Sequence, residues 1–190
     1  LGGSNRYETN LKILQAAGDS ARYEDILICT GTGYADSLSA SAAGKPILLV
    51  NGSITSAQYE FIKNARHYYL IGVTGVVSTS IESYLRNSFG STKVERVAGQ
   101  NRYGTSVEVA KKFFPDGAKA AVFAYAHDFP DGLSGSALAM TVGAPLILTD
   151  NSATAINYAK AYIKTAGIIK AATLGGPALI NDSAVASMLH

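Results

Sequence analysis

The sequence has few of the residues that mark several common classes of small protein. Among its 190 residues there is one cysteine and no tryptophan. One cysteine excludes a disulfide within the chain, and Cys29 stands in the apolar run 26–30, where we expect a buried, unreactive thiol. No apolar run reaches the ~18 residues that a membrane-spanning helix needs. No signal peptide is recognisable, and we interpret the sequence as a fragment of a longer protein, with any export signal left behind.

Charge is also scarce. Charged residues make up 16% of the chain, the formal net charge is +2, and basic residues form no run. A nucleic-acid-binding domain normally carries a dense basic stripe, so we do not expect this class. No Ser-His-Asp order, His-Glu-x-x-His motif or cysteine pair occurs, so the sequence predicts no catalytic residue, metal or cofactor. Hydrophobic residues make up 47%, which predicts a folded, core-rich protein.

What the sequence does contain is an internal duplication. Gly-Ser-Asn-Arg-Tyr-Glu-Thr at 3–9 returns at 99–105 as Gly-Gln-Asn-Arg-Tyr-Gly-Thr. Three further segments return in the same order: 36–39 as 131–134, 46–49 as 145–148, and 70–72 as 173–175. The spacing widens along the chain, which places short insertions in the second copy near 140–142 and 166–168. We predict two domains, 1–92 and 93–190, and the first lacks a strand that the second has at 93–97.

Each copy alternates predicted helices and strands. Apolar residues at helical spacing follow each Asn-Arg-Tyr triplet, and Asn5 and Asn101 are candidate N-caps of these helices. A capping box at 79–82 and Asn181 or Asp182 predict the starts of the last helices. Short apolar runs at 26–30, 46–50, 121–125 and 145–149 are typical of parallel strands covered on both faces, and small-residue helices separate them at 37–43 and 133–142. The pattern predicts two tandem small α/β sandwiches with mostly parallel sheets.

Candidate functional residues follow the predicted strands, where open α/β sheets bind ligands. Asp36 and Asp131 each stand at the start of a helix, where a carboxylate offsets the helix dipole. His127 and Asp128 beside Asp131 suggest an alternative, a metal site or a catalytic pair. The first copy has Thr32 and Gly33 in their places, which argues against a chemistry shared by both copies.

The arginine of each Asn-Arg-Tyr triplet is the second candidate. A guanidinium fork suits phosphate or carboxylate, and the neighbouring Tyr7 or Tyr103 can stack on a sugar ring. The alternative is an intramolecular Arg–Asp pair that holds helix to loop. The turns at 72–75 and 175–178 can likewise cradle an anion or merely reverse the chain.

The four ordered motifs of each copy together resemble the cell-wall-binding repeat type 2 family, over nearly the whole chain. The resemblance implies a secreted, S-layer-like surface protein of Gram-positive bacteria, held to the wall non-covalently by repeats that bind an anionic secondary polymer. It also implies that repeats occur in threes around a pseudo-threefold axis, so a third repeat or self-association is expected. The implied ligand-binding candidates are Asn5, Arg6, Tyr7, Asp36 and Ser39, with Asn101, Arg102, Tyr103, Asp131 and Ser134.

The sequence thus predicts a non-catalytic anchoring module at the extracellular cell surface, without a nucleic-acid partner or membrane span. Two alternatives stay open. One is a structural assembly module whose motif residues only build interfaces between modules. The other is a metal-binding or hydrolytic domain centred on Asp131.

Overall fold

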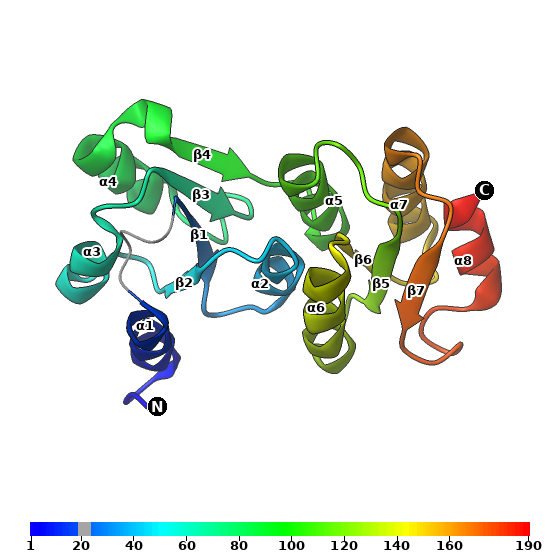
Figure 1. Ribbon diagram of the computed structural model, residues 1–190, viewed down its shortest axis with the longest axis horizontal. Helices are drawn as coiled ribbons and strands as arrows, with labels where there is room; N and C mark the ends of the chain where they lie inside the picture. The colour runs from blue at the N-terminus through cyan, green and yellow to red at the C-terminus, as the bar shows by residue number, and fades with distance from the viewer. Residues whose placement is uncertain (19–23) are drawn as a thin grey trace. The chain divides into compact units, whose positions relative to one another are not determined.

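The computed structural model describes residues 1–18 and 24–190, which form two compact units. Unit 1 comprises Leu1–Ser37 and Lys45–Val97, and unit 2 comprises Leu38–Gly44 and Ala98–His190. Helices and strands alternate along the chain (Figure 1).

The elements up to the second Asn-Arg-Tyr triplet are α1 (Arg6–Ala17), β1 (Asp25–Thr30), α2 (Ala35–Ser41), β2 (Ile47–Val50), α3 (Ser56–Ile62), β3 (His67–Ile71), α4 (Thr79–Phe89), the 3₁₀ turn η2 (Ser91–Lys93) and β4 (Val94–Val97). The later elements are α5 (Arg102–Phe113), β5 (Ala121–Tyr125), α6 (Pro130–Val142), β6 (Leu146–Thr149), α7 (Ala153–Ala166), β7 (Ala171–Leu174) and α8 (Asp182–Leu189). The inserted residues of the second copy lengthen two helices. α6 has 13 residues where α2 has 7, and α7 has 14 where α3 has 7.

Each unit contains one parallel sheet. The strand order is β2-β1-β3-β4 in the first sheet and β6-β5-β7 in the second. Strands β1 and β5 lie inside their sheets and are almost wholly buried, as the continuous apolar runs predict. The predicted α/β class with parallel sheets is confirmed.

The strand at 94–97 pairs differently from the prediction. The sequence assigns it to the second copy, but β4 pairs with β3, from Tyr68↔Val94 to Ile71↔Val97. The first sheet therefore has four strands and the second has three, the reverse of a first copy that lacks a strand. The first compact unit therefore includes this strand, up to Val97. The position of a strand relative to a repeated motif does not show which sheet the strand joins. Here the chain passes from β3 through α4, and β4 then pairs with β3 in the first sheet.

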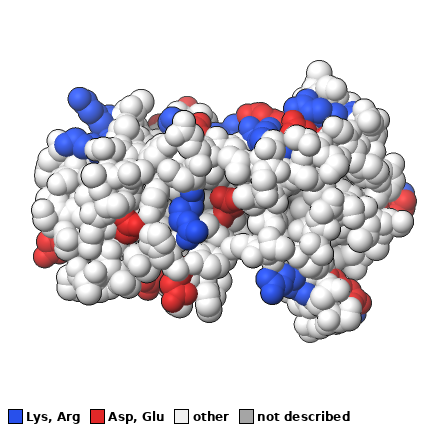
Figure 2. Space-filling model, turned by 180° about the vertical axis from the view of Figure 1, so that it is seen from behind, with Lys and Arg blue, Asp and Glu red and all other residues white. Residues whose placement is uncertain are grey.

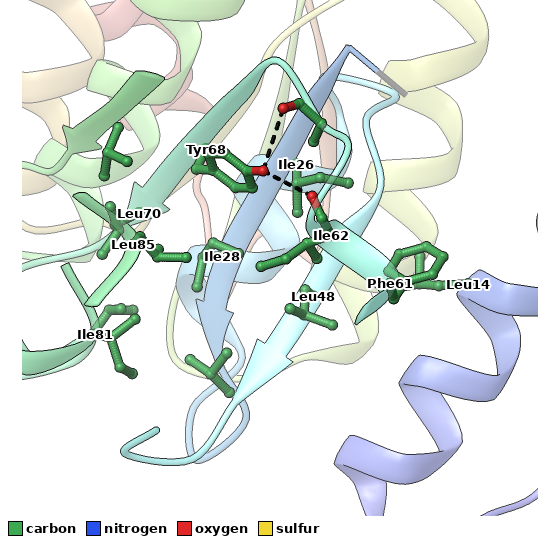
Figure 3. Close-up of a cluster of buried hydrophobic side chains, with 14 of the residues drawn as sticks. Leu14, Ile26, Ile28, Leu48, Phe61, Ile62, Tyr68, Leu70, Ile81 and Leu85 are labelled. Atoms are coloured by element: carbon green, nitrogen blue, oxygen red, sulfur yellow. Dashed lines mark hydrogen bonds between the residues drawn. The ribbon is translucent and has the colours of Figure 1, made fainter. Parts of the chain in front are cut away.

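A hydrophobic core covers one face of the unit 1 sheet (Figure 3). Alternate strand residues meet side chains from α1, α3 and α4 there, among them Ile26, Ile28, Leu48 and Leu70 from strands and Leu14, Phe61, Ile62, Ile81 and Leu85 from helices. Tyr68 is fully buried in this core, and its hydroxyl donates to the carbonyls of Ile62 (2.8 Å) and Ala65 (3.3 Å). The polar end of the ring is therefore satisfied inside an apolar environment.

In unit 2 the corresponding core lies between the sheet and helices α5, α7 and α8. The small-residue helix α6 packs closely on the sheet, as predicted. A Cβ atom added at Gly135 would lie 2.8 Å from Cδ1 of Leu174 and 3.1 Å from Cδ1 of Leu146. A larger residue at 135 would therefore require the side chain of Leu174 to shift.

The structure confirms three predicted helix starts and corrects one. The side chains of Asn5, Asn101 and Asn181 accept hydrogen bonds from backbone amides of the first turns of α1, α5 and α8. The predicted capping box at 79–82 is wrong, because the N-cap of α4 is Ser78. Glu82 then lies one residue beyond the position a capping box requires, and its carboxylate binds arginines instead.

Candidate functional site

The Gly-x-Asn-Arg-Tyr-x-Thr motif forms the same helix start in both units. The backbone amide of Gly3 donates to Oγ1 of Thr9 (2.9 Å), and that of Gly99 donates to Oγ1 of Thr105 (3.1 Å). A Cβ atom at Gly99 would collide with the backbone of Gly104, so only glycine allows this close approach. The glycine, asparagine and threonine of the motif thus have structural roles.

The motif arginines bind the loop that follows the first strand of each repeat. Nη1 of Arg6 donates to the carbonyl of Gly31 after β1, and Nη1 of Arg102 donates to that of Ala126 after β5, each at 2.6 Å. Within 1–18 and 24–190, neither arginine forms an ion pair with a carboxylate. The helix-to-loop connection that the sequence suggests therefore exists, but a main-chain carbonyl replaces aspartate. Arg6 is exposed and Arg102 half-buried, so both reach the surface at the carboxyl ends of the strands.

In unit 1 the motif tyrosine borders a cavity. The ring of Tyr7 packs against Gly31, where a Cβ atom would overlap it. The cavity has a volume of about 370 Å³ and is lined by Asn5, Tyr7, Glu8, Leu11, Asn51, Ser53, Thr55, Ala57 and Gln58. Amide, hydroxyl and phenol groups thus surround a hollow between the start of α1 and the start of α3. Polar groups of this kind, set beside the apolar Leu11 and Ala57, can orient a small ligand.

Beside the cavity, Glu8 is held by the residues around it. Its carboxylate accepts from the hydroxyl and amide of Ser4 and pairs with Lys12 at 3.0 Å. The hydrogen bonds from Ser4 and the charge of Lys12 lower the pKa of Glu8 to about 2. Glu8 therefore stays ionised throughout the physiological range, and the ammonium group of Lys12 balances its charge at the rim of the cavity.

In unit 2 the corresponding place holds a cluster of three polar side chains. The hydroxyl of Tyr103 donates to Oδ2 of Asp150 at 2.5 Å, and Nε2 of His127 lies 2.7 Å from the same oxygen and 3.0 Å from the tyrosine hydroxyl. Oδ1 of Asp150 accepts from the backbone amide of Ser152 (2.7 Å). The cluster joins the start of α5 to the loops after β5 and β6.

The cluster perturbs the pKa values of two of its members in opposite directions. Burial raises the pKa of Asp150, but hydrogen bonds from Ser152, Tyr103 and His127 outweigh it and lower the pKa to about 2. Burial and the hydrogen bond to the Asp150 carboxylate raise the pKa of Tyr103 to about 12. Asp150 is therefore ionised and Tyr103 neutral across the physiological range.

The sequence analysis does not identify Asp150 or its counterpart Asn51 as candidate site residues. Their positions could have indicated them, because each residue immediately follows the second strand of its repeat. The identities differ between copies, so a comparison of repeats passes over them. The sequence suggests a group of His127, Asp128 and Asp131, but in the structure His127 contacts Asp150.

Asp36 and Asp131 lie against the turns that follow β3 and β7. A Cβ atom at Gly72 would collide with Oδ2 of Asp36, and one at Gly175 would lie 3.0 Å from Oδ2 of Asp131. Both glycines have positive φ, 106° and 113°. The repeated aspartate and the repeated glycine therefore form one packing unit in each copy, and glycine is required for conformation and for space.

The serines that end the repeated segments 36–39 and 131–134 have different surroundings. Ser39 is buried, whereas Ser134 is exposed and donates to the carbonyl of Pro130 at 3.1 Å. Their equivalent sequence positions therefore do not give them equal access to a ligand.

The geometry gives no support to a metal centre at Asp131. Among residues 1–18 and 24–190, no group of three or more His, Cys, Asp and Glu side chains is placed to hold a metal ion. Cys29 is fully buried, and burial raises the pKa of its thiol, as expected for an unreactive cysteine.

Charged side chains on the face drawn in Figure 2 form small separate groups of both signs on a largely uncharged surface. Among the described residues on this face, Lys and Arg form no continuous stripe.

Comparison with known proteins places the chain in a family. The family model "Cell wall binding domain 2" matches residues 1–82 and 96–185. The chain belongs to the cell wall binding domain 2 family. It therefore carries two tandem cell-wall-binding domains and associates with the cell wall. The family is one of binding modules, which indicates a non-catalytic role for this part of the protein.

Two curated relatives illustrate the similarity. The chain is 29% identical over 191 residues to the N-acetylmuramoyl-L-alanine amidase LytC of Bacillus subtilis, covering 96% of the chain and 37% of LytC. It is 36% identical over 110 residues to an uncharacterised protein of Pyrococcus abyssi, covering 55% of the chain and 32% of that protein. The chain thus spans about a third of the length of each relative.

Two solved structures share the fold. Cwp8 from Clostridium difficile superposes with a TM-score of 0.80 at 24% identity, covering 98% of the chain and 32% of Cwp8. Cwp6 from the same organism superposes with a TM-score of 0.82 at 22% identity, covering 99% of the chain and 31% of Cwp6. Within the described part of this cell-wall-binding pair, no helix has both the length and the apolar character that crossing a membrane requires.

Proposed function

We propose that this pair of domains anchors a larger exported protein to a Gram-positive cell wall by binding an anionic secondary wall polymer without covalent attachment. The observation that carries the proposal is the family match of both halves, with the same motif geometry built twice. Anchoring of this kind needs no chemistry at the site. It needs repeated weak contacts, because linked sites raise the effective concentration of each next contact.

The motif arginines are the proposed contacts for the phosphates or carboxylates of the polymer. Each uses one guanidinium nitrogen, Nη1, to hold the loop carbonyl, which fixes the plane of the group. The other edge of the planar fork is then pre-oriented for an anion. Tyr7, Asn51 and the cavity beside them are proposed to receive the adjoining sugar.

The remaining motif residues have a supporting role in this proposal. Asn5, Asn101, Asp36 and Asp131 hold helix starts and turns in place. Exposed Ser134 is available to a ligand hydroxyl, whereas buried Ser39 acts through packing.

Co-sedimentation with purified Gram-positive cell walls tests the proposal. The chain should sediment with intact walls, and binding should be lost after chemical stripping of the anionic polymer. Rising salt should weaken binding, because exposed charges are screened. Persistent binding to stripped walls would reject the polymer as ligand.

Arginine variants separate binding from folding. Arg6→Met and Arg102→Met remove the anion contact together with the bond to the loop, whereas Arg6→Lys and Arg102→Lys keep the positive charge. If the arginines bind polymer, the lysine variants should retain more wall binding than the methionine variants at matched melting temperature. Equal wall binding by all variants that remain folded would assign these arginines to the scaffold alone.

A second proposal concerns assembly, and α6 supports it. Large apolar side chains are exposed along this helix, with Leu133 at 62%, Met140 at 55% and Val142 at 56% of their surface. Such a patch is typical of an interaction surface. We propose that it packs against a further repeat of the same family, in the same protein or in a second copy. Light scattering of the chain at rising concentration, with Leu133→Ser and Met140→Ser as a double variant, tests for the second copy.

A further inference from the structure

Strand β7 forms an edge of its sheet, and the corresponding strand of the first sheet is not an edge (Figure 1). β3 and β7 each end immediately before a glycine with positive φ, Gly72 and Gly175. Aligned on these glycines, residues 68–71 correspond to 171–174. β4 pairs with β3 along the whole of this stretch.

Every position of β7 is more exposed than its counterpart in β3. Tyr68, Leu70 and Ile71 are fully buried, whereas Ala171, Thr173 and Leu174 are half-buried. The second residue of β7, Ala172, is exposed, whereas its counterpart Tyr69 is half-buried. The difference is what removal of a covering strand would produce.

We propose that β7 is completed by a parallel strand from a further repeat, namely the strand that immediately precedes that repeat's Gly-x-Asn-Arg-Tyr motif. β4 is the template, because it ends one residue before this motif in the present chain and completes the sheet of the preceding repeat. The inference rests on the assembly with a further repeat proposed above, and it names the edge that such a repeat would complete.

The backbone contacts of the template specify how the added strand binds. The amide of Gly72 donates to the carbonyl of Val97 at 3.0 Å, and the side chain of Arg96 donates to the carbonyl of Gly72 at 2.6 Å. Gly175 occupies the place of Gly72. Its amide should therefore donate to the last residue of the added strand.

The side chains give the edge a specificity that differs from that of the first sheet. Arg96 of β4 pairs with Glu82 of α4 at 2.8 Å. Val185 of α8 stands in the place of Glu82, since each lies four residues after its N-cap, Ser78 or Asn181. An arginine in the added strand would therefore meet an apolar side chain, and an apolar residue should be preferred there.

On the other face of β7 a hollow of about 470 Å³ lies beside the edge. Its lining includes apolar Leu138 and Val142 of α6 and two lysines, Lys119 and Lys170. Successive residues of a strand face opposite sides, so the residue that corresponds to Glu95 would face this hollow. An acidic residue there complements the lysines.

The test extends the chain beyond His190 with a flexible Gly/Ser linker and one of three strands. The tails are Val-Glu-Val-Val, the β4 sequence Val-Glu-Arg-Val, and Val-Pro-Val-Pro. The prolines of the third tail have no backbone N–H groups to donate to β7. Hydrogen exchange of the β7 and Gly175 amides is measured by NMR. We expect protection to rise at least about tenfold with Val-Glu-Val-Val, less with Val-Glu-Arg-Val, and not with the proline tail.

A reciprocal variant tests the specificity. Val185→Glu should reverse the order of the two non-proline tails, provided that its melting temperature shows a folded chain. The same tails on the unmodified chain keep the test valid if that variant unfolds. Unchanged exchange at Gly175 with every tail, or equal protection by the proline tail, would overturn the inference. If no tail protects Gly175 but the chain forms a concentration-dependent dimer that the α6 substitutions abolish, strand addition is rejected and the assembly proposal still holds.

Discussion

The hydroxyl of Tyr103 donates to the carboxylate of Asp150 at 2.5 Å, and this bond ties the start of α5 to the loop after β6. The counterparts in the first domain are Tyr7 and Asn51. In the described part of the chain, the hydroxyl of Tyr7 has no hydrogen-bonding partner. The same motif tyrosine therefore closes a hydrogen-bonded cluster in one domain and borders a cavity in the other.

Tyr103→Phe should destabilise the protein. The variant keeps the ring but removes the donor to an ionised, largely buried carboxylate, so we expect a loss of about 1–2 kcal/mol in the free energy of unfolding. Chemical denaturation measures the loss. Tyr7→Phe is the matched control and should change stability by less than about 0.5 kcal/mol. Equal losses in the two variants would mean that the Asp150 bond contributes nothing.

Asp150 should make the second domain sensitive to acid. Its pKa is about 2 in the folded protein, against an ordinary value of 3.8. Stabilisation by the ionised form is complete above the unfolded pKa and is lost as pH falls from about 4 towards 2. Asp150→Asn, which introduces the residue of the first domain, should be less stable at pH 7 but should lose less stability over this interval. Parallel unfolding curves of both proteins across the acid range would contradict the assignment.

Thr105→Val should be more harmful than Thr9→Val. Thr105 is buried and its hydroxyl accepts from the Gly99 amide, so valine leaves that donor without a partner at a cost of about 1–3 kcal/mol. Thr9 is only half-buried, and water can replace its hydroxyl at the Gly3 amide. Thermal denaturation of the two variants gives the comparison. A larger loss for Thr9→Val would reject burial as the deciding factor.

Gly175→Ala should cost more than Gly176→Ala. Alanine at 175 must adopt a φ of 113° and place its Cβ atom 3.0 Å from the Asp131 carboxylate, so we expect a loss above about 1 kcal/mol. A Cβ atom at Gly176 meets nothing within 4 Å, and its φ is not positive. Melting temperatures of the pair measure the difference. Equal melting temperatures would mean that the turn relaxes without strain.

Much of the fold could be predicted because the repeat locates its elements twice. The apolar runs predicted the positions of the inner strands β1 and β5, and the asparagines predicted where helices begin. Both patterns depend only on neighbouring residues in the sequence. The start of α4 was misplaced by one residue because Ser78 and Thr79 are both good N-caps.

The Tyr103–His127–Asp150 cluster could not be predicted in the same way. Its members come from three separate segments, and the first copy has Thr32 and Asn51 in place of the histidine and aspartate. A search for residues shared by both copies therefore discards two of the three. The structure was needed to bring them together, because only the parallel sheet places the loops after β5 and β6 side by side.

The place of β4 also bears on how arrays of these repeats can grow. Because the strand precedes the motif of one repeat in sequence but completes the sheet of the previous one, the unit that is copied is offset from the unit that folds. A duplication of residues 93–190 would supply the strand missing from the copy before it and leave a new open edge behind. Deletion of the same residues would uncover β3. Each added repeat thus stabilises its predecessor, and the last repeat of any array remains the one whose sheet must find its fourth strand elsewhere.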